Sequence, residues 1–574
     1  MQYTFRCANY SERYLQIEFQ IPNSGLHAIQ AQLPAWRPGR YELQNFAKNI
    51  RNFSASRPDG TSLSSKKISK DRWEIQPQAD ETVLISYEYY ANQLDAGGTF
   101  VDYNQWYINP CTCCMYVDGR ENETFDVHFE VPKDYALAGG WNPTGPHSFS
   151  APDFDTLADA PLILSNELNH RSFKIDEHHF HIWFMGWPDA PWERILPDFK
   201  AFTKGQMKAF KKFTVPEYHF LYQILPTRKY HGVEHLNSTV ICLGPQAEMT
   251  SKNLWEQFLG VSSHELYHTW NIKSIRPTEM QPYDLARENY FETGYIAEGV
   301  TTYMGDLFLS NSNVFNWEEF KTTQEQNLQR HSDNGGNMHA AVVESSFDLW
   351  LDGYASGAPN RKVSIYAEGA LLALMMDIQI RAHSNGAVGL QSVMTDLYHH
   401  FALKGKGYSS SDYQALSAEA GGPEIDAIFS KHVFQKGFYW DTLDRLLEKV
   451  GLEREEKEHE ATSMNRFGIR AVNRNEEIVV IDLWPNSIAA EAGLEPECVL
   501  LEVNGVELKD TLSEVLQKYI AEPIELKVRS AMRTYVVTIK ADDNRYFPKQ
   551  TLVKKENPTK VQKALFKAWC GKDF

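Results

Sequence analysis

The chain has 574 residues, and 57 lysines and arginines against 75 aspartates and glutamates give it a formal net charge of −18. At about 150 residues per domain, this length predicts roughly four domains and excludes a small disulfide-stapled fold. An apolar share of 42% and a charged share of 23% exclude wholesale disorder. The acidic balance disfavours nucleic acid and anionic membrane surfaces as partners, so neither is expected.

The seven cysteines are odd in number and scattered, unlike the framework of a secreted disulfide-rich protein. This favours a reducing compartment, and we expect a cytoplasmic protein. The amino terminus has no basic flank followed by an apolar stretch, so no secretory signal is predicted. The most apolar short segment, residues 370–376, is far shorter than the ~20 residues that cross a membrane.

The first third of the chain alternates apolar and polar residues, for example at Leu15, Ile17, Phe19 and Ile21. This period-two pattern is typical of half-buried strands and predicts an amino-terminal antiparallel β domain over residues 1–168. Residues 34–41, Pro-Ala-Trp-Arg-Pro-Gly-Arg-Tyr, contain two prolines and a glycine and are interpreted as a rigid loop.

Residues 169–450 are expected to form a mainly helical central domain, because the apolar spacing changes to that of helices. Residues 218–225 and 238–243 still resemble strands and predict a small bordering sheet. Residues 366–381 are apolar nearly all round, as in a buried helix.

The last part of the chain is divided by a charged stretch at 451–462, which is interpreted as a linker or a solvated helix end. Residues 463–545 follow as a β domain, in which Asn504 and Gly505 mark a tight hairpin. Residues 546–574 are left as a carboxy-terminal tail.

One motif carries the chemistry: His264-Glu265-Leu266-Tyr267-His268 has the form HExxH inside a plausible helix. The spacing places both imidazoles on one helical face with Cβ atoms ~5–6 Å apart, which suits two ligands of a single Zn²⁺. Glu265 lies where its carboxylate can meet a zinc-bound water and act as general base. The third ligand is predicted to be Glu298, far enough along the chain for a second helix to return. One zinc ion per chain is expected.

The surrounding sequence resembles a known family. Residues 264–277, His-Glu-Leu-Tyr-His-Thr-Trp-Asn-Ile-Lys-Ser-Ile-Arg-Pro, resemble the signature of the PDZ-containing glycyl aminopeptidases, metallopeptidase family sixty-one of the glutamate-zincin clan. Four further segments are similar to that family: the loop at 34–41, Gly-Val-Glu-His at 232–235, Glu-Gly-Val-Thr at 298–301, and a PDZ-like region at 467–540.

The resemblance implies a multidomain α+β protein with an amino-terminal β domain, a mainly helical thermolysin-like zinc peptidase domain and a carboxy-terminal PDZ domain. It implies an aminopeptidase that releases glycine or alanine from peptides with a free amino terminus. Glu234 would bind the substrate's α-ammonium, with Gly232 and His235 at the same edge; from the residues alone, a surface glutamate is the favoured interpretation.

The resemblance also implies two further sites. Tyr366 would donate a hydrogen bond to the tetrahedral oxyanion, the alternative being a buried helix tyrosine. Phe467, Gly468 and Ile469 are positioned like a PDZ carboxylate loop. That loop could bind the carboxy terminus of a peptide, while a purely structural domain is the other interpretation.

The sequence departs from the family pattern at two places. Tyr295 stands where the family commonly has tryptophan, which is a conservative aromatic exchange. Glu368 stands where the family has lysine, and it reverses a charge beside Tyr366.

Two other functions stay open: a PDZ interaction protein with a vestigial peptidase core, and a zinc endopeptidase. The latter depends on whether Glu234 faces the cleft. A histidine-rich segment at His178, His179 and His181 is interpreted as solvated strand histidines, because no metal-binding motif accompanies it in the sequence.

Overall fold

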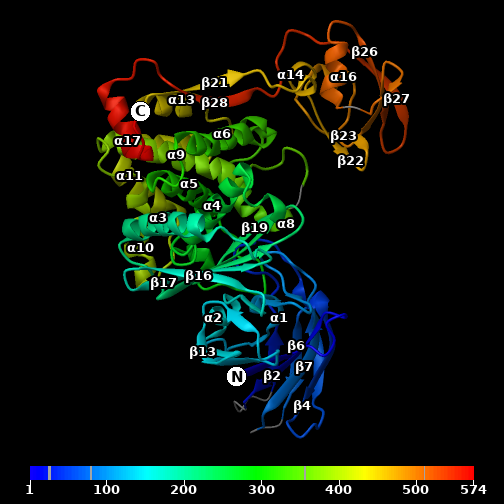
Figure 1. Cartoon of the computed structure of the whole chain (residues 1–574), viewed down its shortest axis with the longest axis vertical. Coiled ribbons are helices and arrows are strands. Elements are labelled where there is room, and N and C mark those ends of the chain that lie inside the picture. The colour runs from blue at the N-terminus through cyan, green and yellow to red at the C-terminus, as the bar shows by residue number, and fades with distance from the viewer. Residues whose placement is uncertain (23–27, 78–80, 355–356, 510) are drawn as a thin grey trace.

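The computed structural model describes residues 1–22, 28–77, 81–354, 357–509 and 511–574. Figure 1 shows three regions: a β domain in blue and cyan that holds the amino terminus, a larger helical region in green and yellow, and a small orange β domain set to one side. The expected multidomain α+β organisation is therefore present.

The amino-terminal region is built on a seven-stranded sheet of order β13-β14-β11-β1-β2-β7-β4. Its alternating sequence produces alternating burial, because Leu15, Ile17, Phe19 and Ile21 all point to the core. Neighbouring strands are antiparallel except β1 and β11, which are parallel. The strands are β1 (Gln2–Arg6), β2 (Tyr14–Ile21), β4 (Ile50–Ser56), β7 (Val83–Tyr90), β11 (Phe125–Phe129), β13 (Asn142–Gly145) and β14 (Ser148–Ala151).

Two four-stranded sheets complete this domain, in the orders β10-β3-β6-β5 and β12-β15-β9-β8. Their elements are β3 (Ile29–Gln32), β5 (Ser64–Ser69), β6 (Arg72–Gln76), β8 (Phe100–Val101), β9 (Trp106–Ile108), β10 (Tyr116–Val117), β12 (Ala136–Ala138) and β15 (Leu162–Ser165), with η1 (Phe46–Asn49), α1 (Pro110–Cys113) and α2 (Phe154–Ala158) between them.

The domain is joined to the rest of the molecule by apolar packing. Tyr107 and Ile163 share a buried cluster with Leu221 and Val240 of the central sheet. That sheet has the order β16-β17-β18-β20-β19, and β19 is one of its edges. It contains the predicted strands at 218–225 and 238–243. The strands are β16 (Asn169–Ile175), β17 (His178–Met185), β18 (Glu217–Ile224), β19 (Lys229–Glu234) and β20 (Ser238–Gly244).

Helices cover the other face of the central sheet. The most buried is α9, whose residues from Ala367 to Ile380 are all enclosed, as the apolar sequence predicts. The larger helical elements are α3 (Trp192–Phe210), α4 (Lys252–Tyr267), the π-helical turn η4 (Tyr295–Val300), α5 (Thr301–Asn311), α6 (Trp317–Asp333), α9 (Ile365–His383), α10 (Leu390–His400), α11 (Ser410–Gly421) and α13 (Trp440–Lys449).

Short helical elements link these helices. They are η2 (Gln246–Glu248), η3 (Thr278–Met280), η5 (Gly335–Met338), α7 (Val342–Phe347), α8 (Leu349–Asp352), η6 (Ala402–Lys404), α12 (Glu424–Ile428) and η7 (Phe429–Val433). Among the helices of the described residues, none has the length and apolar character that crossing a membrane requires.

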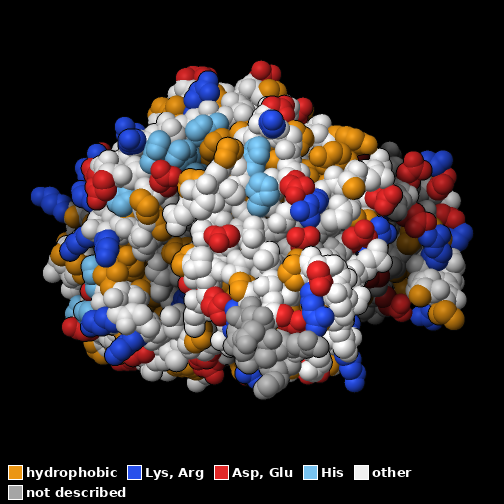
Figure 2. All heavy atoms as spheres, turned by 90° about the horizontal axis from the view of Figure 1, so that it is seen from below, with side chains coloured by type: hydrophobic (Ala, Val, Ile, Leu, Met, Phe, Trp, Pro, Cys, Tyr) orange, Lys and Arg blue, Asp and Glu red, His pale blue; other side chains and the backbone are white. Residues whose placement is uncertain are grey.

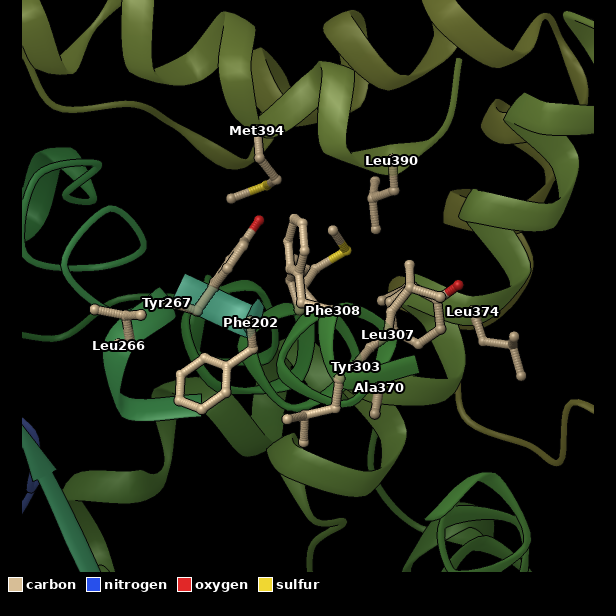
Figure 3. Close-up of a cluster of buried hydrophobic side chains, with 14 of the residues drawn as sticks. Phe202, Leu266, Tyr267, Tyr303, Leu307, Phe308, Ala370, Leu374, Leu390 and Met394 are labelled. Atoms are coloured by element: carbon tan, nitrogen blue, oxygen red, sulfur yellow. The ribbon is translucent and has the colours of Figure 1, made fainter. Parts of the chain in front are cut away.

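The helices are held by one large core, part of which is drawn in Figure 3. Side chains from α3, α4, α5, α9 and α10 converge there, so the last turn of α4 is fixed against four neighbouring helices. The labelled residues are Phe202, Leu266, Tyr267, Tyr303, Leu307, Phe308, Ala370, Leu374, Leu390 and Met394.

Two carboxy-terminal segments differ from the prediction. Part of the stretch at 451–462 forms β21 (Leu452–Lys457), which pairs with β28 (Lys549–Lys554). Residues 546–574 are not a tail, because β28 is followed by α17 (Lys560–Cys570), whose Phe566 and Trp569 enter the main core. The apolar face of α17 is short, so the sequence pattern alone does not predict that this helix packs into the main core.

The orange β domain lies between β21 and β28 in sequence and has its own core. Its sheet has the order β22-β23-β24-β26-β27, with β25 beside β24. Arg470 on β22 bonds Asp333 of α6 at 2.7 Å and links the two regions. The elements are α14 (Thr462–Phe467), β22 (Ile469–Arg474), β23 (Glu477–Leu483), α15 (Ile488–Glu491), β24 (Val499–Val503), β25 (Val506–Glu507), α16 (Leu512–Lys518), β26 (Ile524–Arg529) and β27 (Thr534–Ile539).

Candidate active site

The predicted HExxH motif occupies the carboxy-terminal end of α4. The helix begins at a capping serine, Ser251, whose side chain accepts from Leu254 N. His264 lies in the last turn, and His268 caps the helix. His268 Nδ1 lies 2.6 Å from the carbonyl oxygen of Asn271. Because a carbonyl only accepts, Nδ1 carries the proton and Nε2 keeps a lone pair for a metal.

The side chain of Asn271 connects this helix end to the segment with the third predicted ligand. Its Nδ2 donates to Ile296 O at 2.9 Å and to Thr301 Oγ1 at 3.0 Å. Both partners flank Glu298, which lies in the π-helical turn η4. Such turns are rare and often mark functional sites. Asn271 therefore positions His268 and Glu298 relative to each other.

The three predicted ligands converge. The Nε2 atoms of His264 and His268 are 2.9 Å apart, and Glu298 Oε2 lies 3.8 Å and 3.4 Å from them. Zinc bonds of about 2.0–2.2 Å at tetrahedral angles separate ligand atoms by about 3.3–3.6 Å. The three observed separations lie on either side of this range, so small side-chain shifts bring two imidazoles and one carboxylate to zinc-binding positions and leave a fourth position for water.

The electrostatics of the site favour a cation. Burial by itself would raise the pKa of Glu298, but His268 and His264 hold it at about 2. Burial by itself would lower the pKa of His268, but Glu234 and Glu298 raise it to about 10. The raised pKa of His268 reports the negative potential of the neighbouring carboxylates, which also stabilises a metal cation between them.

Glu265 points into the same space with its carboxylate buried. Its Oε2 has no hydrogen-bond partner among the described residues. Burial raises the pKa of Glu265 well above its usual range, and Glu234 and Glu298 add to this. Gly232 on β19 leaves the necessary room, because a Cβ there would collide with the Glu265 carboxylate. The arrangement suits a carboxylate that takes and returns a proton.

These groups line one cavity of about 810 Å³. It lies between the amino-terminal domain, the edge strand β19 and helices α4, α6 and α9. Gly232, Glu234, Glu265 and Tyr366 contribute to its wall together with the three metal-ligand candidates. A volume of this size accommodates a short peptide or a drug-sized ligand.

Glu234 faces the cavity at the end of β19 and is 4% exposed. Its Oε1 has no partner among the described residues. Gly39 of the amino-terminal domain adopts φ 82° and lies so close that a Cβ there would collide with the Glu234 carboxylate. A buried carboxylate without a partner is costly unless a cation or donor binds to it.

The loop at 34–41 brings the amino-terminal domain to the metal-ligand candidates. Ala35 N donates to Leu285 O at 2.7 Å, and Trp36 Nε1 donates to Asp284 O at 2.8 Å. The anchored loop places Tyr41, which donates to Glu298 Oε1 at 3.3 Å. Sequence reasoning missed this contact, and the only signal for it was the resemblance of the loop to its family counterpart.

Tyr366 lies in the first turn of α9, which Ser364 caps, and it lines the cavity. Its hydroxyl donates to Tyr354 Oη at 3.4 Å. Burial raises the pKa of Tyr366, which keeps the hydroxyl protonated as a donor. Tyr354 also lines the cavity and was missed by sequence reasoning.

The two departures from the family pattern lie in the interior. Glu368 is fully buried and accepts from His331 Nδ1 at 2.7 Å, while His331 Nε2 accepts from Tyr439 N. It is not among the described residues that line the cavity, and its carboxylate is bonded to His331 inside the helical core. Tyr295 is also fully buried.

The remaining predicted residues lie elsewhere. His235 Nδ1 lies 3.0 Å from Asp159 Oδ1, which also accepts a hydrogen bond from Lys273. His235 is not among the described residues that line the cavity. Phe467 and Ile469 are fully buried in the carboxy-terminal β domain. The Gly468 N–H is bonded to Met464 O at 3.1 Å.

Comparisons with known proteins support the site. Residues 2–166 match the Peptidase M61 N-terminal domain, and residues 257–372 match the M61 glycyl aminopeptidase domain. The second match spans His264, His268 and Glu298. A search of curated proteins finds no match.

One solved structure has a similar fold over nearly the whole chain. An aminopeptidase N family protein from Idiomarina loihiensis has a TM-score of 0.91 and 24% identity, over 98% of this chain and 99% of that one. An M1 zinc metallopeptidase from Deinococcus radiodurans has a TM-score of 0.47 and 14% identity, over 76% and 93% of the two chains, which is too distant to support an argument. This chain belongs to the M61 peptidase family and is a metallopeptidase that carries the family's glycyl aminopeptidase domain.

Proposed function

We propose that this protein is a zinc aminopeptidase that hydrolyses the first peptide bond of peptides with small amino-terminal residues. The observation that carries the proposal is the position of Glu234, a buried carboxylate without a partner for its Oε1, on the same cavity as His264, His268 and Glu298. The preference for glycine or alanine rests on the match to the glycyl aminopeptidase domain.

Glu234 would select free amino termini. A substrate's α-ammonium can pair with the buried carboxylate, and this ion pair fixes the chain so that only the first peptide bond reaches the metal-ligand candidates. Gly39 and Gly232 leave the space beside Glu234 and Glu265 open. An endopeptidase must also bind residues on the amino-terminal side of the scissile bond, and a buried carboxylate at the position of Glu234 would block them.

Glu265 would move the proton. When bound to His264, His268 and Glu298, zinc supplies Lewis acidity that activates water and polarises the scissile carbonyl. Glu265 takes a proton from the attacking water and delivers it to the departing amine. Tyr366, whose hydroxyl stays protonated, donates to the oxygen that becomes negative. Tyr41 holds Glu298 in place.

The test compares glycyl and alanyl anilides with their amino-terminally acetylated forms. We expect the free amines to be cleaved much faster than the acetylated forms, cleavage to be lost on chelation, and kcat to fall about 10²- to 10⁴-fold for Glu265→Gln with the metal content unchanged. Equal cleavage of free and acetylated substrates would contradict the aminopeptidase function. A protein without chelator-sensitive activity would support a vestigial peptidase core.

We also propose that the carboxy-terminal β domain is a PDZ module that adds a peptide strand to β22. Two observations support this: β22 is an edge of its sheet, and it directly follows Phe467 and Gly468. Titration with a peptide and with its carboxy-terminally amidated form tests the idea. Weaker binding of the amidated form is expected, and equal binding would contradict carboxylate capture.

A reducing, cytoplasmic location is our third proposal. All seven cysteines are free thiols, and six of them are buried. Localisation of the tagged full-length chain in its own cells tests it, and a secreted pool would contradict it.

A further inference from the structure

A cluster of histidines occupies the face of the central sheet that points away from α3 and α4. His170 belongs to β16, His179 and His181 to β17, and Glu217 and His219 to β18. The strand register explains the grouping, because His179 pairs with Glu217 and His181 pairs with His219. Residues at alternate positions share one face of a sheet. Figure 2 views the molecule from below and shows pale blue histidine side chains gathered on this side.

Three of these residues can hold a metal ion. One ligand atom each from His179, His181 and Glu217 lies within 4.8 Å of the others. The side chain of Glu217 is 54% exposed, and His179 is half-buried, so small rotations can bring the ligand atoms to metal-binding separation. Two imidazoles and a carboxylate form a donor set typical of zinc.

The ring nitrogens of His181 are already arranged for coordination. Its Nδ1 lies 3.1 Å from His170 Nε2. Its Nε2 is buried and has no hydrogen-bond partner among the described residues. A metal-binding imidazole commonly donates through its other nitrogen to a neighbour that fixes its orientation. His170 can accept such a proton and leave His181 Nε2 free for the metal.

His219 supports the cluster in a different way. Trp183 Nε1 donates to His219 Nδ1 at 3.2 Å, so the proton of a neutral His219 is on Nε2. That nitrogen makes no hydrogen bond among the described residues and lies 3.8 Å from Glu217 Oε2. His219 is therefore a neighbour of Glu217 and is not proposed as a ligand.

We propose that His179, His181 and Glu217 form a zinc site separate from the catalytic one, with a water as the remaining ligand. None of the three is among the described residues that line the cavity of about 810 Å³. The ion connects β17 to β18 beside Trp183, which packs against the cluster that joins the sheet to the amino-terminal domain. Its role is structural, and bound zinc raises the thermal stability of the protein.

The test measures zinc stoichiometry on full-length protein from which metal has been removed. His264→Ala removes a ligand of the catalytic site, so zinc that remains bound to this variant reports the new site alone. We expect this variant to bind one equivalent of zinc with a rise in Tm. Adding His179→Ala and His181→Ala is expected to abolish both effects.

Controls separate the site from general damage. His178→Gln changes a histidine on the same strand and opposite face, and it is expected to leave the stoichiometry intact. His170→Ala removes the orienting partner and is expected to weaken zinc binding about 10- to 100-fold. With an intact catalytic site, His179→Ala with His181→Ala is expected to retain peptidase activity, which shows that the variant folds. Absence of zinc from His264→Ala, or its retention after the further double substitution, would overturn the proposal.

Discussion

Tyr41 of the amino-terminal domain donates a hydrogen bond to Glu298 of the central domain, with 3.3 Å between the two oxygens. The contact joins residues far apart in sequence and places a β-domain side chain behind a candidate metal ligand. Trp36 from the same loop packs edge-on against Trp350 with ring centroids 5.1 Å apart. The amino-terminal domain therefore forms part of the candidate active site.

Replacement of Tyr41 by phenylalanine tests this contact. Loss of the partner that orients a metal-binding carboxylate typically costs 10- to 100-fold in metal affinity, and we expect about that loss. Competition with a chelator measures it, and saturating zinc should restore part of the activity. Tyr135→Phe removes a hydroxyl that bonds Tyr103 O elsewhere in the domain and serves as the control. An unchanged zinc affinity in Tyr41→Phe would show that the bond does not hold Glu298.

The proposed role of Glu234 in amine binding predicts a selective loss of activity on substrates with a free amino terminus. Glu234→Gln keeps the shape of the side chain and removes its charge. A hydrogen bond to a charged group is worth about 1.5–3 kcal/mol, so kcat/KM for free glycyl anilides should fall about 10- to 100-fold. Residual cleavage of acetylated anilides should not fall. Equal losses on both substrates would assign Glu234 a general structural role.

Gly232 should tolerate no side chain, because a Cβ would displace the Glu265 carboxylate. We expect Gly232→Ala to lower kcat about 10²-fold, the cost of misplacing a catalytic group, while zinc content is unchanged. Gly260→Ala on α4 is the matched control, because the nearest atom to its new Cβ is 4.0 Å away. Full activity of Gly232→Ala would mean that Glu265 can act from another position.

Asp306 makes stability depend on pH. Burial raises its pKa from 3.8 to about 7, so the folded protein retains a proton that the unfolded chain has released between these values. The contribution of Asp306 is therefore greatest below pH 3.8 and declines as the pH rises to about 7, by at most about 1.4 kcal/mol per unit. Asp306→Asn should remove this decline. Thermal melts from pH 5 to pH 8 measure it, with the exposed Asp189→Asn as the control. Parallel pH curves for Asp306→Asn and the parent protein would refute the assignment.

The carboxy-terminal helix should be essential to the central domain. Trp569 is fully buried, and its Nε1 donates to Tyr303 Oη at 2.8 Å. Truncation of such a side chain costs about 3–5 kcal/mol, so Trp569→Ala should lower the Tm of the peptidase domain markedly. Lys563→Ala on the exposed side of α17 should be nearly neutral. A stable Trp569→Ala protein would mean that the helix is dispensable.

Local patterns predicted much of this molecule correctly. The alternation at Leu15, Ile17, Phe19 and Ile21 located β2, and the continuous apolar run of α9 indicated its burial. Both features depend on which side chains of a single element avoid water, and the apolar pattern of consecutive residues is enough to predict this. The four-residue spacing of His264 and His268 likewise fixes their common face on any helix.

Long-range relationships were decided by the fold. The amphipathic pattern in residues 546–574 is too short to predict a core helix, and the burial of Trp569 in the main core is decided by the packing of distant helices. The sequence places His179 and His181 on one face of a strand, because they are two residues apart. Glu217 becomes their neighbour only through the parallel pairing of β17 and β18.

By itself, the sequence determined the chemistry of the metal-ligand candidates, because HExxH carries its geometry within a single helix. Tertiary structure decided what surrounds them: Glu234 on the shared cavity, Gly232 beside Glu265 and Tyr41 behind Glu298. Spacing along one helix is set by local backbone geometry. Contacts between distant segments depend on how sheets and helices pack, which no local pattern specifies.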